Sequence, residues 1–371
     1  MTDTMNHRKI RISEFQAKTG RFAARHPKLL VKMGNLESRI AADHIEAMPV
    51  DRPIYVAGLA RSGTTILLEH LAEHEGIVTH RYRDFPFVHV PLWWDKFIRR
   101  AALNNEEPVQ RFHQDRIRVT SDSPEAMEEI LWMAFFKNAH NPEVSSIIGP
   151  ENDCPLFNRF YETHIQKLLF MRQGRRYAAK NNYNINRLAY LQSLFAGARF
   201  IIMVREPVEQ VASLIRQHEL MCVQEKKDSR VLEYMRQSGH FEFGLDRRPI
   251  NTGPSTQDVC RLWSRGEEIR GWARYWASIY QFVFELLEEN DVLRRMCLVL
   301  HYDDLCMQSV RILRHLYDHC ELNVKKETIL RQSEHLQKTG YYQCHFTREE
   351  RQIIEEETER VHRRISRLCP K

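Results

Sequence analysis

The stretch from Ala57 to Thr65, Ala-Gly-Leu-Ala-Arg-Ser-Gly-Thr-Thr, holds residues whose types and spacing suit the binding of a phosphate. A short apolar run precedes it and an apolar pattern at helical spacing follows it, so we predict a turn between a buried strand and a helix. Such a turn directs backbone N–H groups and the positive end of a helix at one point. The spacing from Gly58 to Gly63 is that of a phosphate-binding loop, but Thr64 stands where a nucleoside triphosphatase needs lysine. We therefore expect a short 5′ group rather than a triphosphate.

The pentapeptide Arg61-Ser62-Gly63-Thr64-Thr65 after a predicted strand resembles the 5′-phosphosulfate loop of sulfotransferases, in which a basic residue precedes Ser-Gly-Thr-Thr. Those enzymes take the sulfuryl group from 3′-phosphoadenosine 5′-phosphosulfate (PAPS). The resemblance implies that Arg61 and the N–H groups of Ser62 to Thr65 hold the 5′-phosphosulfate and meet the leaving phosphate. An ordinary strand-to-helix turn with small residues has the same local pattern, so a second match is needed.

A second match begins with the apolar strand predicted over 199–205 and continues through Glu206, Pro207 and Ser213. Sulfotransferases close a strand with Arg, follow it with an acidic residue and Pro, and place a Ser eight residues after the Arg. The resemblance implies that Arg205 and Ser213 bind the 3′-phosphate of the donor. Because the two motifs occur in the order found in the family, chance is a poor explanation for both.

Two lysines extend the resemblance. Lys180 ends a strand predicted over 176–180 and matches a lysine that the carbohydrate and tyrosyl-protein branches carry at a strand end. This match implies a contact with the sulfuryl or bridging oxygen, and a plain surface lysine is the alternative. Lys338 lies in a segment similar to the late loop that returns over the nucleotide. That similarity implies that Lys338 lies near the 3′-phosphate and that Tyr341 or Tyr342 lies near the base.

Sulfuryl transfer also needs a group that removes the proton of the acceptor hydroxyl. In the same two branches an acidic residue lies in the loop after the second strand, and Asp84 is the match here, although the family more often has Glu. Cytosolic small-molecule sulfotransferases use a histidine, so His80 and His89 are the alternatives. The resemblance thus implies catalytic roles for Asp84, Lys180 and Arg61.

The composition is that of an ordinary globular protein with a mild basic excess. The chain has 55 Lys and Arg against 49 Asp and Glu, a formal net charge of +6, and 43% hydrophobic residues. This excess fits an anionic ligand better than a nucleic-acid coat. No apolar run approaches the roughly 20 residues of a membrane span, and the N-terminus lacks the apolar segment of a signal peptide, so we expect a cytoplasmic protein. The 8 cysteines form no Cys-x-x-Cys pair and are expected to be reduced thiols.

The elements that must position these residues alternate between strands and helices. With helices between them, strands are predicted at 54–56, 76–80, 176–180, 199–205 and 297–302. Such alternation favours an α/β fold, a P-loop-like parallel β-sheet flanked by helices, with helical insertions. Parallel sheets bind ligands at the carboxyl ends of their strands. Because Arg61, Lys180 and Arg205 all sit at such ends, we predict that they form one anion site.

We divide the chain into two parts. Residues 1–50 are predicted to be N-terminal helices that pack on the core, and residues 51–371 to be the sulfotransferase-like α/β domain. Insertions at about 81–170 and 220–295 are expected on the acceptor side of this domain. The N-terminal helices and residues 85–170 have no match in the resemblance, so we expect them to select the acceptor.

Three local predictions concern the insertions. Residues 80–100 are rich in proline and aromatics, which predicts an irregular loop that lines a cleft. Residues 124–136 are predicted to be a helix with Pro124 in its first turn. The aromatic stripe of Trp272, Trp276 and Tyr280, at four-residue spacing on a predicted helix, is expected to be core.

Together these observations predict a sulfotransferase that moves a sulfuryl group from PAPS to a hydroxyl of a carbohydrate-containing acceptor, such as a polysaccharide or glycolipid. The aromatic- and arginine-rich residues 81–100 favour a sugar. No metal is expected, because neither an acidic metal site nor a triphosphate-type loop is evident. Nucleic acid is not expected as a partner, while peripheral membrane contact and a homo-oligomer stay open. The alternatives are a P-loop nucleotide kinase, which the missing lysine opposes, and a non-catalytic module that binds an anionic partner.

Overall fold

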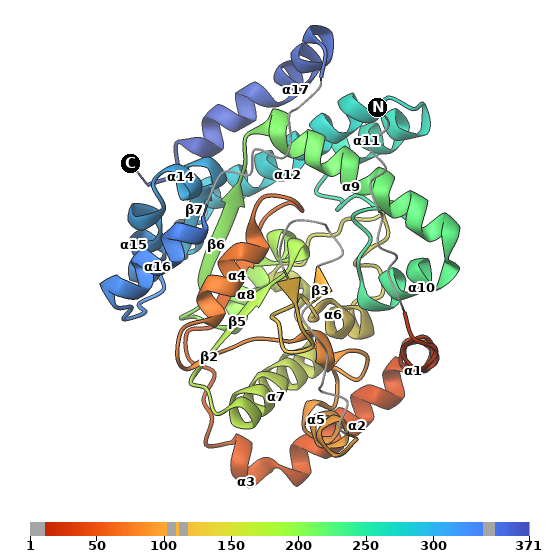
Figure 1. Cartoon of the computed structure of the whole chain (residues 1–371), viewed down its shortest axis with the longest axis vertical. Helices are drawn as coiled ribbons and strands as arrows, with labels where there is room; N and C mark the ends of the chain where they lie inside the picture. The colour runs from red at the N-terminus through yellow and green to blue at the C-terminus, as the bar shows by residue number, and fades with distance from the viewer. Residues whose placement is uncertain (1–11, 102–108, 111–117, 337–345, 371) are drawn as a thin grey trace.

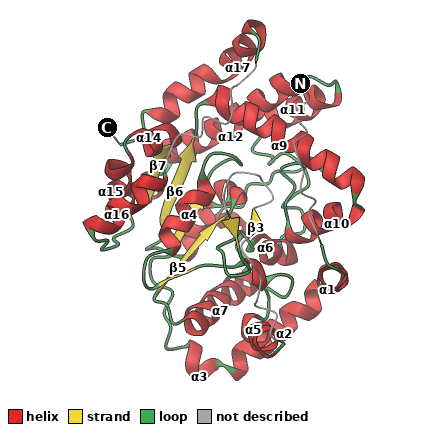
Figure 2. Cartoon of the chain, in the orientation of Figure 1, coloured by secondary structure: helices red, strands yellow, loops and turns green. Residues whose placement is uncertain are grey.

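The computed structural model describes residues 12–101, 109–110, 118–336 and 346–370. Figure 1 shows a central sheet surrounded by helices, and Figure 2 shows that helix is the dominant secondary structure. Among the described residues, the central sheet has five strands, all parallel, in the order β2-β5-β1-β6-β7. This arrangement confirms the predicted α/β class.

The strands of the central sheet are short, and a separate antiparallel pair lies outside it. The central strands are β1 (Ile54–Ala57), β2 (Ile77–Val78), β5 (Arg176–Lys180), β6 (Arg199–Val204) and β7 (Cys297–His301). The antiparallel pair joins β3 (Val109–Gln110) to β4 (Arg118–Val119).

Helices connect the strands and form the outer layers (Figure 1). The α-helices are α1 (Glu14–Arg25), α2 (Pro27–Ile40), α3 (Ala42–Ile45), α4 (Thr64–Ala72), α5 (Pro91–Arg100), α6 (Glu129–Phe135), α7 (Pro155–Arg172), α8 (Leu188–Leu194), α9 (Pro207–Lys227), α10 (Ser229–Ser238), α11 (Ser255–Ser264), α12 (Glu268–Glu289), α13 (Asp291–Met296), α14 (Tyr302–Met307), α15 (Ser309–His319), α16 (Lys326–His335) and α17 (Arg348–Ser366). Short 3-10 helices are η1 (Tyr82–Asp84), η2 (Pro150–Asn152) and η3 (Asn182–Asn186).

The two faces of the sheet pack against different helices because side chains alternate along a strand. On β1, Tyr55 and Ala57 belong to the larger hydrophobic core, which includes residues of α7 and α12. Ile54 and Val56 point to the other face and belong to a second core with α4 and α15. A central strand of a parallel sheet is buried on both faces, which explains why β1 reads as a continuous apolar run.

The register of β1 with its two neighbours aligns the ends of three strands. Val56 pairs with Lys180 on β5 and with Ile201 on β6. Because the strands are parallel, their carboxyl ends meet at one edge of the sheet. The loop after β1, the end of β5 and the junction between β6 and α9 therefore lie next to one another, as the predicted anion site requires.

The N-terminal helices are attached to the rest of the chain by a buried ion pair. The ammonium group of Lys167 on α7 donates to Glu37 Oε2 on α2 at 2.9 Å and to the carbonyl of Gly34 at 3.2 Å. Both charged side chains are almost fully buried. Burial raises the pKa of Glu37 and lowers the pKa of Lys167 in spite of their contact.

Two local predictions in the first insertion are wrong. Residues 91–100 form α5 rather than a loop, because Pro91 suits the first turn of a helix and Asp95 and Ile98 share its buried face. The helix predicted from Pro124 begins only at Glu129. Pro124 instead forms an antiparallel bridge with Arg81, which keeps the chain extended before the helix.

The predicted aromatic core of α12 is confirmed, since Trp272, Trp276 and Tyr280 are at most 1% exposed. The seven cysteines in the described ranges are free thiols, and Cys344 lies outside those ranges. Among the residues that the structure describes, none of the helices has both the length and the apolar character that a membrane span requires.

Candidate active site

The loop between β1 and α4 turns sharply at three residues. The φ angles are +150° at Gly58, +68° at Arg61 and +97° at Gly63, all in the region that favours glycine. At Gly63 space is also restricted, because a Cβ atom there would lie 2.5 Å from the ring of Tyr302. Helix α4 begins at Thr64, directly after this turn. The N–H groups in the first turn of a helix can hold an anion, as the sequence predicts here.

Arg61 and Ser213 meet although 152 positions separate them. Arg61 Nε donates to Ser213 Oγ at 3.0 Å. Ser213 lies about two turns into α9 and is almost fully buried. The two predicted halves of the donor site are thus in direct contact through a hydrogen bond.

Arg205 lies at the junction of β6 and α9, on the same side as Arg61. One of its terminal nitrogens donates to the backbone carbonyl of Arg61 at 3.3 Å, and the other contacts Glu209 at the same distance. The guanidinium lies over the ring of Tyr302, with 4.9 Å to its centroid. The Nε atom is buried without a hydrogen-bond partner among the described residues. Arg205 therefore keeps a donor for a ligand.

Lys180 is buried at the carboxyl end of β5. The next residue, Asn181, donates its backbone N–H to the carbonyl of Val56 at 3.2 Å, which fixes the end of β5 against β1. The Asn181 side chain donates to Glu129 at 2.7 Å. These contacts hold Lys180 at the edge of the sheet where the loop after β1 begins.

Glu129 holds the side chain of Asn181 and thereby the end of β5. Arg187 donates to both carboxylate oxygens of Glu129, each at 2.7 Å, and His140 approaches the same carboxylate at 2.6 Å. Burial alone would raise the pKa of Glu129, but Arg187 and His140 lower it below the ordinary value. Glu129 is therefore an ionised structural group, and it orients the residue after Lys180.

Asp84 lies in a buried ion pair. One nitrogen of Arg172 donates to both carboxylate oxygens of Asp84, at 2.6 and 2.8 Å, and His80 Nδ1 lies 3.2 Å from the same group. Burial would raise the pKa of Asp84, but Arg172 and His80 hold it well below its usual range. A carboxylate that resists protonation is a weak base. The predicted role of Asp84 as the base stays a prediction, and these contacts disfavour it.

The two alternative histidines are also buried. His80 Nε2 lies 3.2 Å from Nε2 of His164, so both of its ring nitrogens have neighbours within the protein. Burial and the nearby Lys167 lower the pKa of His89 to about 4. Each histidine is only 1% exposed. Their environments are those of core residues.

Sequence reasoning missed three residues that hold the loop after β1. Gln210 on α9 donates to the carbonyls of Leu59 and Ala60, at 3.3 and 2.9 Å, and accepts from Trp276 Nε1 at 2.9 Å. The hydroxyl of Tyr280 donates to the Met203 carbonyl at 2.7 Å. Trp276 and Tyr280, which were predicted as core residues, thus also support the loop. The only indication of these contacts in the sequence was a glutamine, Gln210, five positions after Arg205.

The structure brings together Arg61, Arg205 and Ser213, with the loop residues Ser62, Gly63, Thr64 and Thr65 at the start of α4. Lys180 lies at the end of the neighbouring strand. Asp84 and His80 lie in a buried cluster with partners of their own, and His89 is buried with neither ring nitrogen hydrogen-bonded among the described residues. Lys338, Tyr341 and Tyr342 lie outside the described residues.

Comparisons with known proteins identify the family of this chain. The chain matches the sulfotransferase family over residues 53–237, about half of its length. Similar solved structures include a sulfotransferase from Mycobacterium avium, with 16% identity, a TM-score of 0.52 and coverage of 93% of this chain and 85% of that chain. A sulfotransferase from Mycobacterium tuberculosis has 14% identity, a TM-score of 0.46 and coverage of 93% and 86%. No curated protein sequence matches the chain.

The matched segment contains the loop after β1, the end of β5 and the junction of β6 with α9. The chain belongs to the sulfotransferase family, and it is an enzyme whose sulfuryl donor is PAPS. The likeness to the Mycobacterium avium enzyme, at 16% identity, shows a shared fold.

We expect Gln210→Met to weaken the binding of adenosine 3′,5′-bisphosphate, the product of the donor, about tenfold. The variant keeps the side-chain volume but leaves the carbonyls of Leu59 and Ala60 without their donor, a cost of roughly 1–3 kcal/mol. Isothermal titration calorimetry measures the change. Gln224→Met, at another buried glutamine of α9, is the control and should bind normally. Equal affinity in both variants would show that Gln210 does not hold the loop.

We expect Asp84→Asn to lower the free energy of unfolding by roughly 3–5 kcal/mol, because Arg172 is left as a buried charge without its partner. Asp84 has a lowered pKa in the folded protein, so its stabilising effect is present above about pH 4 and is lost as the pH falls. Urea denaturation between about pH 5 and about pH 2, where this effect is lost, should therefore show a weaker acid sensitivity in the variant than in the wild type.

The same variant tests the predicted base. In the folded variant we expect turnover within a few-fold of the wild type at saturating donor and acceptor. Loss of a general base would instead lower kcat by roughly 10²–10⁴ with donor affinity unchanged. Such a fall in kcat, without a change in the free energy of unfolding, would show that Asp84 is the base.

Proposed function

We propose that the protein transfers the sulfuryl group of PAPS to a hydroxyl of a carbohydrate-containing acceptor. The loop after β1 and Arg61 would hold the 5′-phosphosulfate, and Arg205 and Ser213 would hold the 3′-phosphate. Lys180 would contact the sulfuryl or bridging oxygen. In this reaction the acceptor oxygen forms a bond to sulfur, the bond from sulfur to the phosphate oxygen breaks, and adenosine 3′,5′-bisphosphate leaves.

The single observation that carries the donor assignment is the meeting of Arg61, Ser213 and Arg205. Arg61 donates to Ser213 Oγ at 3.0 Å, and Arg205 donates to the backbone carbonyl of Arg61 at 3.3 Å, so two cationic side chains from different elements lie at this edge of the sheet. A donor with one phosphate group at each end of its ribose supplies negative charge for both arginines.

The chemistry at the sulfur needs positive charge on the leaving side. As the bond to the phosphate breaks, negative charge grows on the bridging oxygen. The N–H groups at the start of α4 and the cations of Arg61 and Lys180 lie at strand ends that can surround this oxygen. The N–H groups at the start of α4 belong to the backbone and are fixed before the donor binds, so they need little rearrangement during the reaction.

The case for a saccharide acceptor rests on the segment that follows Lys180. It contains Asn182, Asn184 and Asn186 in η3, and each has a buried side-chain oxygen without a hydrogen-bond partner within the described ranges. The side-chain nitrogen of Asn182 donates to Glu242 at 2.7 Å, which fixes the direction of its oxygen. An amide oxygen accepts from hydroxyl groups, and a sugar supplies hydroxyls at close spacing.

The aromatic segment that first suggested a sugar contributes less. Trp94 stacks on Phe97 with 5.3 Å between ring centroids and packs edge-on against Phe87 at 4.8 Å. Its indole N–H donates to the Arg83 carbonyl at 2.8 Å. These rings pack against one another, so the amides of η3 are the better support for a saccharide acceptor.

We expect Arg205→Ala to weaken the binding of adenosine 3′,5′-bisphosphate about 100-fold, because a charge-assisted pair to phosphate contributes roughly 1.5–3 kcal/mol. Binding of AMP, which lacks the 3′-phosphate, should not change. Arg314→Ala on the exposed side of α15 is the control. Calorimetric titrations of both ligands give the comparison, and a parallel loss for both would place Arg205 elsewhere than at the 3′-phosphate.

For the acceptor, we expect wild-type protein with PAPS to sulfate oligosaccharides in preference to simple phenols or a tyrosine peptide. Mass spectrometry of the products identifies the sulfated compound. Asn182→Ala should raise the KM for the saccharide about tenfold with the donor affinity unchanged, because one hydrogen bond to a hydroxyl is lost. Turnover of phenols or the tyrosine peptide alone would reject the saccharide while leaving the donor assignment intact.

A further inference from the structure

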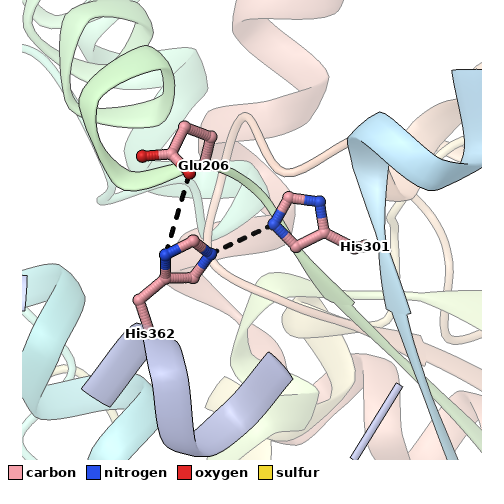
Figure 3. Close-up of side chains that lie close together, drawn as sticks. All are labelled: Glu206, His301 and His362. Atoms are coloured by element: carbon pink, nitrogen blue, oxygen red, sulfur yellow. Dashed lines mark hydrogen bonds and ion pairs between the residues drawn. The ribbon is translucent and has the colours of Figure 1, made fainter. Parts of the chain in front are cut away.

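Three side chains that no step of sulfuryl transfer uses lie together beside the donor site. Figure 3 shows Glu206, His301 and His362 pointing toward one another from three different elements. Glu206 is the N-cap residue of α9, His301 ends β7, and His362 lies on α17. The three residues are far apart in the sequence, so the fold alone brings them together.

The distances within this cluster suit the ligands of a metal ion. Nε2 of His301 lies 3.2 Å from Nε2 of His362, and Glu206 Oε2 lies 3.7 Å from Nδ1 of His362. One potential ligand atom from each residue lies within 4.8 Å of the other two. A tetrahedral zinc ion with bonds of about 2.0–2.1 Å to two imidazole nitrogens holds them roughly 3.3 Å apart. The two histidines therefore already stand at this spacing, while Glu206 lies on the Nδ1 side of His362 and its carboxylate must move to share the ion.

The surroundings of the cluster also fit. Asp303 Oδ2 lies 3.5 Å from Nδ1 of His301, the nitrogen that faces away from His362. The backbone N–H of Asp303 donates to the same nitrogen at 3.4 Å, so the ring of His301 is held in one orientation. The side chains are 14% exposed for His301, 23% for His362 and 42% for Glu206. A metal could thus enter from solvent and keep water as a further ligand.

We propose that Glu206, His301 and His362 bind a divalent transition metal, with two imidazole nitrogens and one carboxylate as the protein ligands. Zinc fits this mixed set of nitrogen and oxygen donors, while calcium and magnesium prefer oxygen ligands alone. The site is separate from the reaction, and no step of sulfuryl transfer passes through the metal.

The position of the cluster indicates what the metal would do. Helix α17 packs on α12, α9 and β7, and His362 lies on the part of α17 that reaches Glu206 and His301. A bound ion would join α17 to the end of β7 and to the start of α9. Arg205 directly precedes Glu206, so the metal would also fix the backbone that carries the 3′-phosphate ligand.

The test is a titration of the full chain, freed of metal with a chelator, with zinc chloride alone. We expect one zinc ion per chain at this site, and at least a 100-fold loss of affinity in His301→Ala and in His362→Ala. Glu206→Gln, which keeps both histidines, should lose about tenfold. His335→Ala, at an exposed histidine on α16, is the control and should bind as the wild type does.

Two further readouts separate this site from other zinc ligands in the chain. Cobalt at a site with nitrogen and oxygen ligands lacks the intense near-ultraviolet band of a thiolate ligand, so that band would assign the metal to a cysteine and overturn the proposal. Zinc should raise the melting temperature of the wild type and leave the melting temperature of the His362→Ala variant unchanged. Binding that is absent, or that survives both histidine substitutions in proteins shown to be folded by circular dichroism, would also overturn it.

Discussion

Backbone pairing of β1 with β5 on one side and β6 on the other is the constraint on which the active site depends. Val56 pairs with Lys180 and with Ile201, so the register of three strands is set at a single position. The loop after β1, Lys180 and the start of α9 are then carried to one edge of the sheet. A slip of one residue in either pairing would turn the side chains of a strand to the opposite face and separate the cations.

A second layer of contacts holds the loop once the strands are aligned. Gln210 and Tyr280 bond to backbone atoms of the loop and of β6, and the ring of Tyr302 lies between Gly63 and the guanidinium of Arg205. These side chains come from α9, α12 and α14, which are distant in sequence from β1. Helices on both sides of the sheet thus hold the proposed donor site in place. The interior of the second insertion, through α12, is part of this support.

The sequence was sufficient to predict the five strands of the central sheet, their parallel pairing and the place of Arg61, Lys180 and Arg205 at one edge of the sheet. Each of these depends on a local signal: an apolar run, a glycine at a positive φ, or a proline at the first turn of a helix. The base could not be found in the same way. Asp84 has the right place after the second strand, but its partner Arg172 lies at the end of α7, and the pairing of the two is visible only in the fold. The prediction of a cleft-lining loop around Trp94 failed for the same reason, because the residues of a cleft and those of a packed aromatic cluster look alike in a sequence.

The most direct test of the donor site is a crystal structure of the protein with adenosine 3′,5′-bisphosphate. Our account predicts the 5′-phosphate at the N–H groups of residues 62–65 and the 3′-phosphate within hydrogen-bond distance of Arg205 and Ser213. Arg61 would turn from Ser213 toward the 5′ end of the nucleotide. A nucleotide bound at another edge of the sheet, or with its 3′-phosphate away from Arg205, would contradict the account.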